Sequence, residues 1–211
     1  MNTFFSLMAH GLLLMTVLLM LLQVRRWKQY WPLAYLLSAV VVVLPISNWL
    51  LIEFSRGYIT DISFASLVML GMYLLAILKP KRPRNQLSFN FAILLFAILL
   101  YPASLGLTQF DPYAMGFASH EYFDYLIMSV ALIGIVAAYM GYWQLALWLT
   151  LSCLAFGLHI YESSNLWNYL LDPLAVIASL VSCLNMACQR MYFKFFNGAK
   201  HGDKQGVQSN A

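Results

Sequence analysis

The sequence predicts an all-α, polytopic integral membrane protein with seven transmembrane helices, its N-terminus outside and its C-terminus cytoplasmic. The chain has 211 residues, of which 62% are hydrophobic and only 9% charged, whereas soluble domains carry about 25% charged residues. Seven apolar stretches are each long enough to cross a hydrocarbon core of about 30 Å, which takes about 20 helical residues. The basic residues between these stretches favour one side of the membrane, which sets the orientation.

The seven apolar stretches occupy residues 4–24, 32–52, 63–79, 88–107, 124–141, 144–161 and 166–188. They are continuously apolar and do not alternate, so the sequence favours helices over the strands of a membrane barrel. The first stretch is not expected to be a cleaved signal peptide, because positive charges follow it and none precedes it.

Lysine and arginine gather after the first, third and seventh stretches: Arg25, Arg26, Lys28, Lys79, Lys81, Arg82, Arg84, Arg190, Lys194, Lys200 and Lys204. The positive-inside rule places these segments in the cytoplasm, which leaves Arg56 alone on the outer side. The formal charge of +4 is therefore read as a topology signal, and no nucleic-acid partner is expected. The compact chain without extensions predicts a bacterial cytoplasmic (inner) membrane protein.

One seven-helix domain is predicted over residues 1–196, and the polar segment 197–211 is predicted to be a disordered cytoplasmic tail. The longest outer connection is 108–125. Within it Asp111 precedes Pro112, which is typical of a helix N-cap followed by proline at the first helical position. A short amphipathic helix near 110–119, lying in the outer interface, is therefore predicted.

Most acidic residues and histidines fall on the outer side. His120 and Asp124 are four residues apart, and His159 and Glu162 are three apart, so each pair would share a helix face. A carboxylate beside an imidazole suits a general base, a metal ligand or a proton relay. The candidate catalytic residues are His159, Glu162, Asp172, His120 and Asp124, and the candidate ligands for a divalent metal are His120, Asp124, His159 and Glu162.

Three prolines, Pro45, Pro102 and Pro173, fall in the outer halves of predicted spans. A proline inside a helix removes one backbone hydrogen bond and kinks the helix, so three kinks at a similar depth predict a splayed outer half with a polar cavity. Asp172 would line this cavity, with His159, His10 or Arg56 as its partner, because ionisable groups inside membranes normally face the bundle interior. In the alternative, Asp172 is structural and caps backbone groups freed by Pro173.

Three functions fit this pattern. The first is binding or modification of a lipid or lipid-linked headgroup at the outer leaflet, in envelope biogenesis, with Arg56, Glu53, Asp111, Asp172 and His10 as substrate-binding residues. The second is a non-catalytic subunit of an inner-membrane complex, which docks a membrane-protein partner through its outer acidic face. The third is a small transporter coupled to protons or a metal. No Walker-type or GxSxG motif occurs in the chain, and the sequence leaves open whether the protein is an enzyme.

Overall fold

The computed structural model describes residues 2–22, 30–46, 49–59, 61–78 and 86–206, with side chains described from Phe4 to Tyr192 except at Trp31, Ile46, Trp49 and Leu78. In chain order the elements are α1 (Asn2–Leu21), α2 (Trp31–Val42), β1 (Pro45–Ile46), β2 (Trp49–Leu50), α3 (Leu51–Tyr58), α4 (Phe64–Leu78), α5 (Gln86–Ser104), the 3-10 turn η2 (Ala114–Gly116), α6 (Phe123–Tyr139), α7 (Trp143–Gly157), α8 (Trp167–Leu170) and α9 (Pro173–Gly206). Apart from the hairpin of β1 and β2, the regular elements of the described residues are helical, as predicted.

Among the described residues, three helices are long and apolar enough to cross a membrane: α1, α5 and α9, through Phe4–Leu21, Gln86–Ser104 and Pro173–Tyr192. Helices α2, α4, α6 and α7 are apolar but shorter. These lengths and compositions indicate a membrane protein. The number of seven spans and the orientation of the two termini stay predictions.

The second predicted span, 32–52, is not one helix. Helix α2 ends at Val42, and α3 begins at Leu51 after the antiparallel hairpin of β1 and β2, in which Pro45 lies opposite Leu50. Proline has no N–H for a helical hydrogen bond, and its ring disfavours the α conformation of the preceding residue. Pro45 therefore lies in a helix break, and the prediction of a kink there was wrong.

The last predicted span, 166–188, is also divided. Helix α8 ends at Leu170, and α9 begins at Pro173 after an extended residue. Pro173 occupies the first position of α9, where the missing N–H would have no helical partner in any case. Of the three prolines, Pro102 alone lies inside a helix, so the prediction of three kinks at one depth was wrong.

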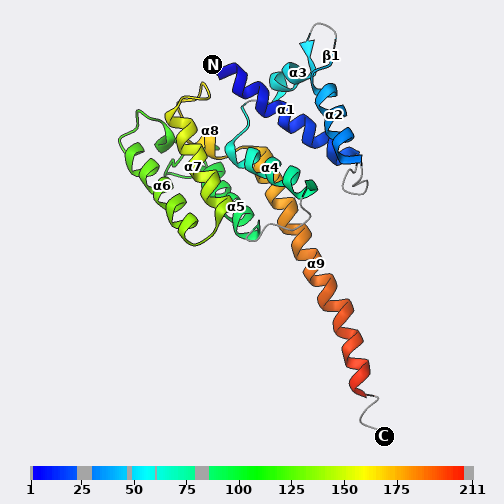
Figure 1. The fold of residues 1–211 in the computed structure, drawn as a ribbon. Coiled ribbons are helices and arrows are strands. Elements are labelled where there is room, and N and C mark those ends of the chain that lie inside the picture. Colours follow the sequence, from blue (N-terminus) through cyan, green and yellow to red (C-terminus); the bar gives the residue numbers. More distant parts are fainter. Residues whose placement is uncertain (1, 23–29, 47–48, 60, 79–85, 207–211) are drawn as a thin grey trace.

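Helix α9 contains 34 residues, or about 51 Å at 1.5 Å per residue, which exceeds a hydrocarbon core of about 30 Å. Its carboxyl-terminal half projects away from the other helices (Figure 1). The segment from residue 197 that was predicted to be disordered is helical as far as Gly206, and residues 207–211 lie outside the described residues.

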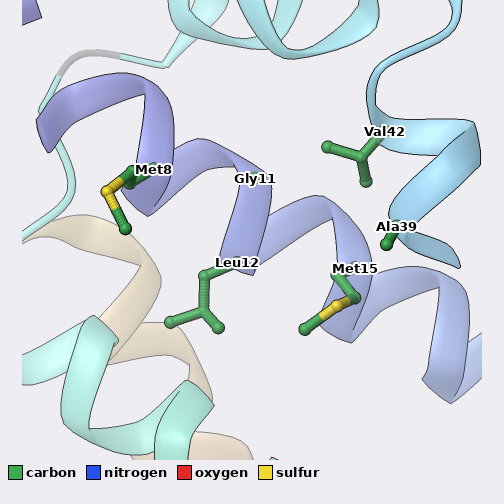
Figure 2. Close-up of a pocket in the computed structure, with 6 residues that line it drawn as sticks. All are labelled: Met8, Gly11, Leu12, Met15, Ala39 and Val42. Atoms are coloured by element: carbon green, nitrogen blue, oxygen red, sulfur yellow. The ribbon is translucent and has the colours of Figure 1, made fainter. Parts of the chain in front are cut away.

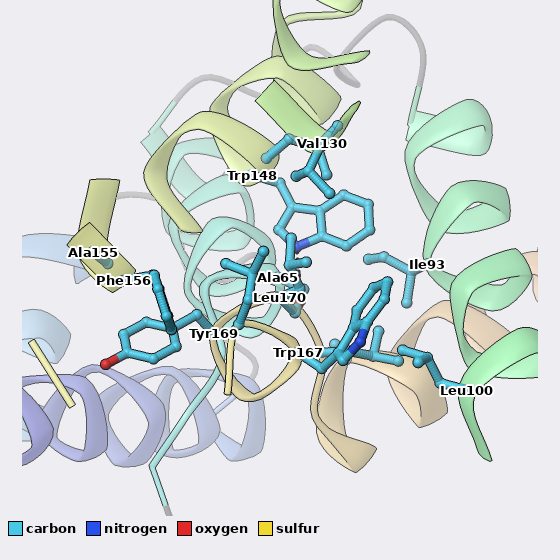
Figure 3. Close-up of a cluster of buried hydrophobic side chains, with 14 of the residues drawn as sticks. Ala65, Ile93, Leu100, Val130, Trp148, Ala155, Phe156, Trp167, Tyr169 and Leu170 are labelled. Carbon is cyan, nitrogen blue, oxygen red and sulfur yellow. Dashed lines mark hydrogen bonds between the residues drawn. The ribbon is translucent and has the colours of Figure 1, made fainter. Parts of the chain in front are cut away.

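Helix α4 lies between two groups of helices (Figure 1): it contacts α1 on one side and α7, α8 and α9 on the other. The main core belongs to the second group, where Trp148 and Tyr169 are fully buried (Figure 3). The Trp148 ring meets the Phe89 and Phe96 rings edge-on, with centroids 5.8 and 5.5 Å apart, a favourable geometry for aromatic pairs. We call this second group, which comprises α5 to α9, the core group.

Helices α5, α6 and α7 end in the same way. A residue just beyond each helix has a positive φ: 72° at Gly106, 79° at Gly141 and 49° at His159. In α7 the Ile160 N–H then donates to the Ala155 carbonyl at 3.0 Å, which closes the helix end in a Schellman arrangement. His159 takes the position that glycine takes in the other two helices.

Candidate functional site

The Asp172 carboxylate is an N-cap of α9. It is buried, and its Oδ1 accepts a hydrogen bond from the Ala175 N–H at 2.7 Å. Two further donors come from a distant segment: the Ser63 N–H donates to Oδ2 and the Ser66 hydroxyl to Oδ1, both at 2.7 Å. Capping by aspartate is worth about 1 kcal/mol. The geometry thus matches the structural alternative for Asp172.

His10 is fully buried in α1. Its Nδ1 lies 2.8 Å from the Ser6 carbonyl oxygen on its own helix, and its Nε2 lies 2.9 Å from the carbonyl oxygen of Ile59. His10 therefore fastens α1 to the residue that follows α3. Among the described residues, no hydrogen bond joins His10, His159 or Arg56 to Asp172, so the predicted partners of Asp172 are replaced by backbone and serine donors.

The segment between α3 and α4 is also held, at the end near α4, by a tyrosine hydroxyl. Tyr161 lies in the connection between α7 and α8, and its hydroxyl donates to the Ile62 carbonyl at 2.7 Å. Burial first, and then the carboxylates of Asp61 and Asp172, raise the pKa of Tyr161 well above its usual value, so the phenol remains a hydrogen-bond donor. Asp172 and Tyr161 together anchor this segment to the core group.

Asp111 caps a turn and not the helix that the sequence predicted. Its Oδ1 accepts from the N–H groups of Tyr113 and Ala114 at 3.0 and 3.3 Å. The element that follows is the three-residue turn η2, in place of the short amphipathic helix predicted near 110–119. The Asp111 carboxylate is thus occupied by its own backbone.

This turn is joined to the segment before α8. The Leu166 N–H donates to the Gly116 carbonyl at 2.8 Å, and the Trp167 indole N–H donates to the Pro112 carbonyl at 2.8 Å. The backbones approach so closely that a Cβ on Gly116 would collide with the Asn165 amide and the Trp167 ring. We call the two joined segments, 105–122 and 158–171, the outer cap, after the side of the membrane on which the sequence predicts them.

The two histidine–carboxylate pairs do not lie on helix faces. His120 precedes α6, and its Nδ1 accepts from the Tyr122 N–H at 3.2 Å. His159 follows α7 in a left-handed conformation, and Glu162 lies in the connection after it. His120 and Asp124 therefore do not share a helix face, and neither do His159 and Glu162. Among the described residues, no three His, Cys, Asp or Glu side chains gather where they could hold a metal ion.

Helix α3 carries Glu53 and Arg56. The Glu53 carboxylate bonds to the backbone at the start of its own helix: its Oε2 accepts from the Leu50 N–H at 2.9 Å. Ile52 packs on α1, because a Cβ on Gly11 would lie 3.2 Å from Ile52 Cδ1. Residues four apart share a helix face, so Arg56 lies on the side of α3 that faces α1. Among the described residues, no ion pair or hydrogen bond engages its guanidinium.

An apolar groove runs between α1 and α2 beside this contact (Figure 2). Its volume is about 250 Å³. It is lined by Met8, Gly11, Leu12, Met15, Ala39 and Val42. The sequence analysis did not predict this groove. Two of its lining residues, Gly11 and Ala39, are small, and small residues on adjacent helices leave space between them.

No protein-family model matches the chain, and neither the curated proteins nor the solved structures contain a match to it.

Proposed function

We propose that the protein binds a membrane lipid, with an acyl chain in the α1–α2 groove and the headgroup at α3. The observation that carries this proposal is the apolar groove in the membrane-spanning helix α1, bordered by a short helix that bears an arginine with no partner among the described residues. This keeps the lipid function expected from the sequence but moves its site away from Asp172 and the histidines.

The groove supplies shape for a flexible chain. Met8 and Met15 line it, and methionine adapts to irregular apolar partners. Lipid tails are as apolar as leucine, so moving a chain from the bilayer into the groove gains little from the hydrophobic effect. Selectivity has to come from the headgroup.

Arg56 is placed to supply that selectivity. It lies on α3 between Ile52, which packs on Gly11, and Ile59, whose carbonyl oxygen meets His10. A guanidinium binds phosphate with two parallel hydrogen bonds. The neighbouring aromatic pair Phe54 and Tyr58, with ring centroids 5.0 Å apart, is exposed and suits the headgroup layer. The proposed ligand is therefore an anionic phospholipid.

Binding, without modification, is proposed. The Asp172 carboxylate already accepts three hydrogen bonds, and His159 closes the end of α7. Under the predicted orientation the site belongs to the outer leaflet of a bacterial inner membrane, so we place the protein in envelope lipid handling.

Native mass spectrometry tests this proposal. The full chain is released from nanodiscs that contain equal amounts of phosphatidylglycerol and phosphatidylcholine, as wild type, Arg56→Gln and the charge-matched control Arg190→Gln. We expect phosphatidylglycerol adducts on wild type and on the control, and their loss in Arg56→Gln. Equal retention of both lipids by all three proteins would sink the proposal.

A second candidate is a non-catalytic subunit of a membrane complex, favoured by the outer cap. The cap and the start of α6 carry exposed carboxylates at Asp111, Glu121, Asp124 and Glu162, and segments 105–125 and 158–172 contain no Lys or Arg. Hydrogen bonds between the two cap segments hold them together.

Photo-crosslinking in host membranes tests this second function. A photo-crosslinking residue at Glu121 is compared with one at the exposed Ile135 on α6. A discrete adduct at Glu121 that disappears at high salt would support a basic partner, and identical labelling at both positions would exclude one at this surface.

A further inference from the structure

We propose that the hairpin of α6 and α7 compresses the bilayer beside it and selects phospholipids with short acyl chains there. The proposal takes α6 and α7 as membrane-crossing, as the sequence predicts. It concerns the side of the core group that lies beyond α7, away from the α1–α2 groove (Figure 1). It does not depend on the lipid site at Arg56.

Both helices of the hairpin are short, and turns fix their ends. Helix α6 has 17 residues and α7 has 15, or about 26 and 23 Å at 1.5 Å per residue. The Tyr142 N–H donates to the Ala137 carbonyl at 2.8 Å, which ends α6, and α7 begins at the next residue, Trp143. The Ile160 N–H closes the other end of α7. Neither helix can lengthen without breaking these turns.

Polar groups limit the part of the hairpin that fits into hydrocarbon. Asp124, in the first turn of α6, is exposed, and a carboxylate belongs in the headgroup layer. At the other end, the connecting turn carries the last carbonyls of α6 and the first N–H groups of α7, which helices leave without helical partners and hydrocarbon cannot satisfy. Asp124 and Tyr139 are 15 positions apart, or about 23 Å. A hydrocarbon core of about 30 Å is thicker by about 7 Å.

The outer face of the hairpin is suited to lipid. Helix α6 packs mainly on α7 and η2, and its other side exposes the large apolar side chains of Met128, Leu132 and Ile135. Helix–helix interfaces in membranes favour small residues, so this face fits acyl chains better than a second copy. Exposed aromatic side chains border it, Tyr125 at one end and Tyr139 and Trp143 at the other, which is typical of the two membrane interfaces.

The protein has no means of its own to relieve this mismatch. Tilting lowers the height of a helix, so it helps helices that are too long and not those that are too short. Long cationic side chains could extend to the interface, but segment 105–189 contains no Lys or Arg. The bilayer therefore has to become thinner. Helix α5, with 19 residues, is about 29 Å long, so the compression is confined to the side of the hairpin.

Spin-label accessibility tests the compression. Single labels are placed in a cysteine-free form of the full chain, in vesicles of dioleoylphosphatidylcholine. One pair of positions is Tyr125→Cys and Tyr139→Cys on α6. The matched control pair is Phe91→Cys on α5 and Leu105→Cys just after it, with the same spacing of 14 positions. All four native side chains are exposed. A water-soluble nickel chelate relaxes labels in water or among headgroups, and oxygen relaxes labels in hydrocarbon.

We expect the nickel chelate to reach both labels on α6. On the control pair it should reach the label at Leu105, while the label at Phe91 should respond to oxygen. A label at Tyr125 or Tyr139 that only oxygen reaches overturns the proposal, because the bilayer then keeps its thickness beside the hairpin. Nickel access at Phe91 also overturns it, because the thinning is then not local.

A label at Leu132→Cys tests whether a second copy covers the hairpin. We expect strong relaxation by oxygen and no dipolar broadening between labels. Broadening, with loss of oxygen access, would show that two copies pack through α6, and it overturns lipid as the occupant of this face.

Selection of chain length is measured in vesicles that contain equal amounts of dimyristoleoyl- and dierucoylphosphatidylcholine. A fluorophore at Leu132→Cys on α6 or at Ile98→Cys on α5, both exposed positions, is quenched by bromine carried on one lipid or the other. We expect the short-chain lipid to quench more strongly at Leu132 and the two lipids to quench equally at Ile98. The same quenching ratio at both positions overturns chain selection. Because neither position lies at the α1–α2 groove, this result and the Arg56→Gln result can fail independently.

Discussion

The Ser63 N–H donates to Asp172 Oδ2 at 2.7 Å, across 109 positions of the chain. With the Ser66 hydroxyl on Oδ1, this contact makes one carboxylate the N-cap of α9 and the anchor of the segment before α4. Asp172 therefore connects the amino-terminal helices to the core group, a role that needs no substrate.

Replacing Asp172 tests this role. Asp172→Asn removes the charge and turns an N–H₂ donor toward the Ser63 or Ala175 N–H, which leaves a buried donor unsatisfied at a cost of about 1–3 kcal/mol. We expect the free energy of unfolding in detergent to fall by that amount, while Asp124→Asn, at an exposed position, changes it little. Unchanged stability in Asp172→Asn together with lost lipid binding would instead restore Asp172 as a ligand-binding residue.

The outer cap depends on the absence of a side chain at Gly116. Gly116→Ala places a Cβ against the Asn165 amide and the Trp167 ring, and such overpacking costs about 1–3 kcal/mol. Gly71→Ala is the control, because no atom lies within 4 Å of its added Cβ and alanine favours a helix interior by about 1 kcal/mol. Thermal unfolding should separate the two variants in opposite directions. A neutral Gly116→Ala would show that the cap segments separate without cost.

The left-handed conformation of His159 predicts a stabilising substitution. A residue with a Cβ loses roughly 1–2 kcal/mol in this region, so His159→Gly should raise the unfolding temperature slightly. The reference substitution is Gly106→Ala at the end of α5, where φ is 72°, and it should lower the unfolding temperature. A large loss of stability in His159→Gly would indicate that the imidazole makes a contact worth more than the backbone strain.

Trp148 joins the aromatic core to the chain before α9. Its indole N–H donates to the Leu170 carbonyl at 2.7 Å, so Trp148→Phe leaves a buried carbonyl without this donor, at a cost of about 1–3 kcal/mol. Trp143→Phe, at a position 65% exposed, is the matched control. Denaturant unfolding of both should show a loss in Trp148→Phe alone, and equal losses would remove the special role of this bond.

The sequence located the important polar residues better than it assigned their partners. Asp172 and His10 stood out because an ionisable group in an apolar run needs compensation. Their partners are mostly backbone groups, such as the Ser63 N–H and the Ile59 carbonyl, which every residue carries. No side-chain pattern could identify which of them would be near.

Local pattern also explains which elements were predicted. Long apolar runs determined that the chain is helical and suited to a membrane, because a backbone in lipid must satisfy its own hydrogen bonds. The Asp111–Pro112 cap was readable, since capping depends on adjacent residues. The breaks at Pro45 and Pro173 were missed because a proline fits both the inside and the start of a membrane helix, and hydropathy does not distinguish the two.

By itself, then, the sequence determined composition, helical class and the positions where polarity is costly, all of which follow from short-range chemistry. Only the tertiary structure decided that Asp172 caps α9, that His10 fastens α3 to α1 and that an apolar groove lies between α1 and α2. These features join residues distant in the chain through backbone atoms and packing shape, so they exist only once the helices are placed against one another.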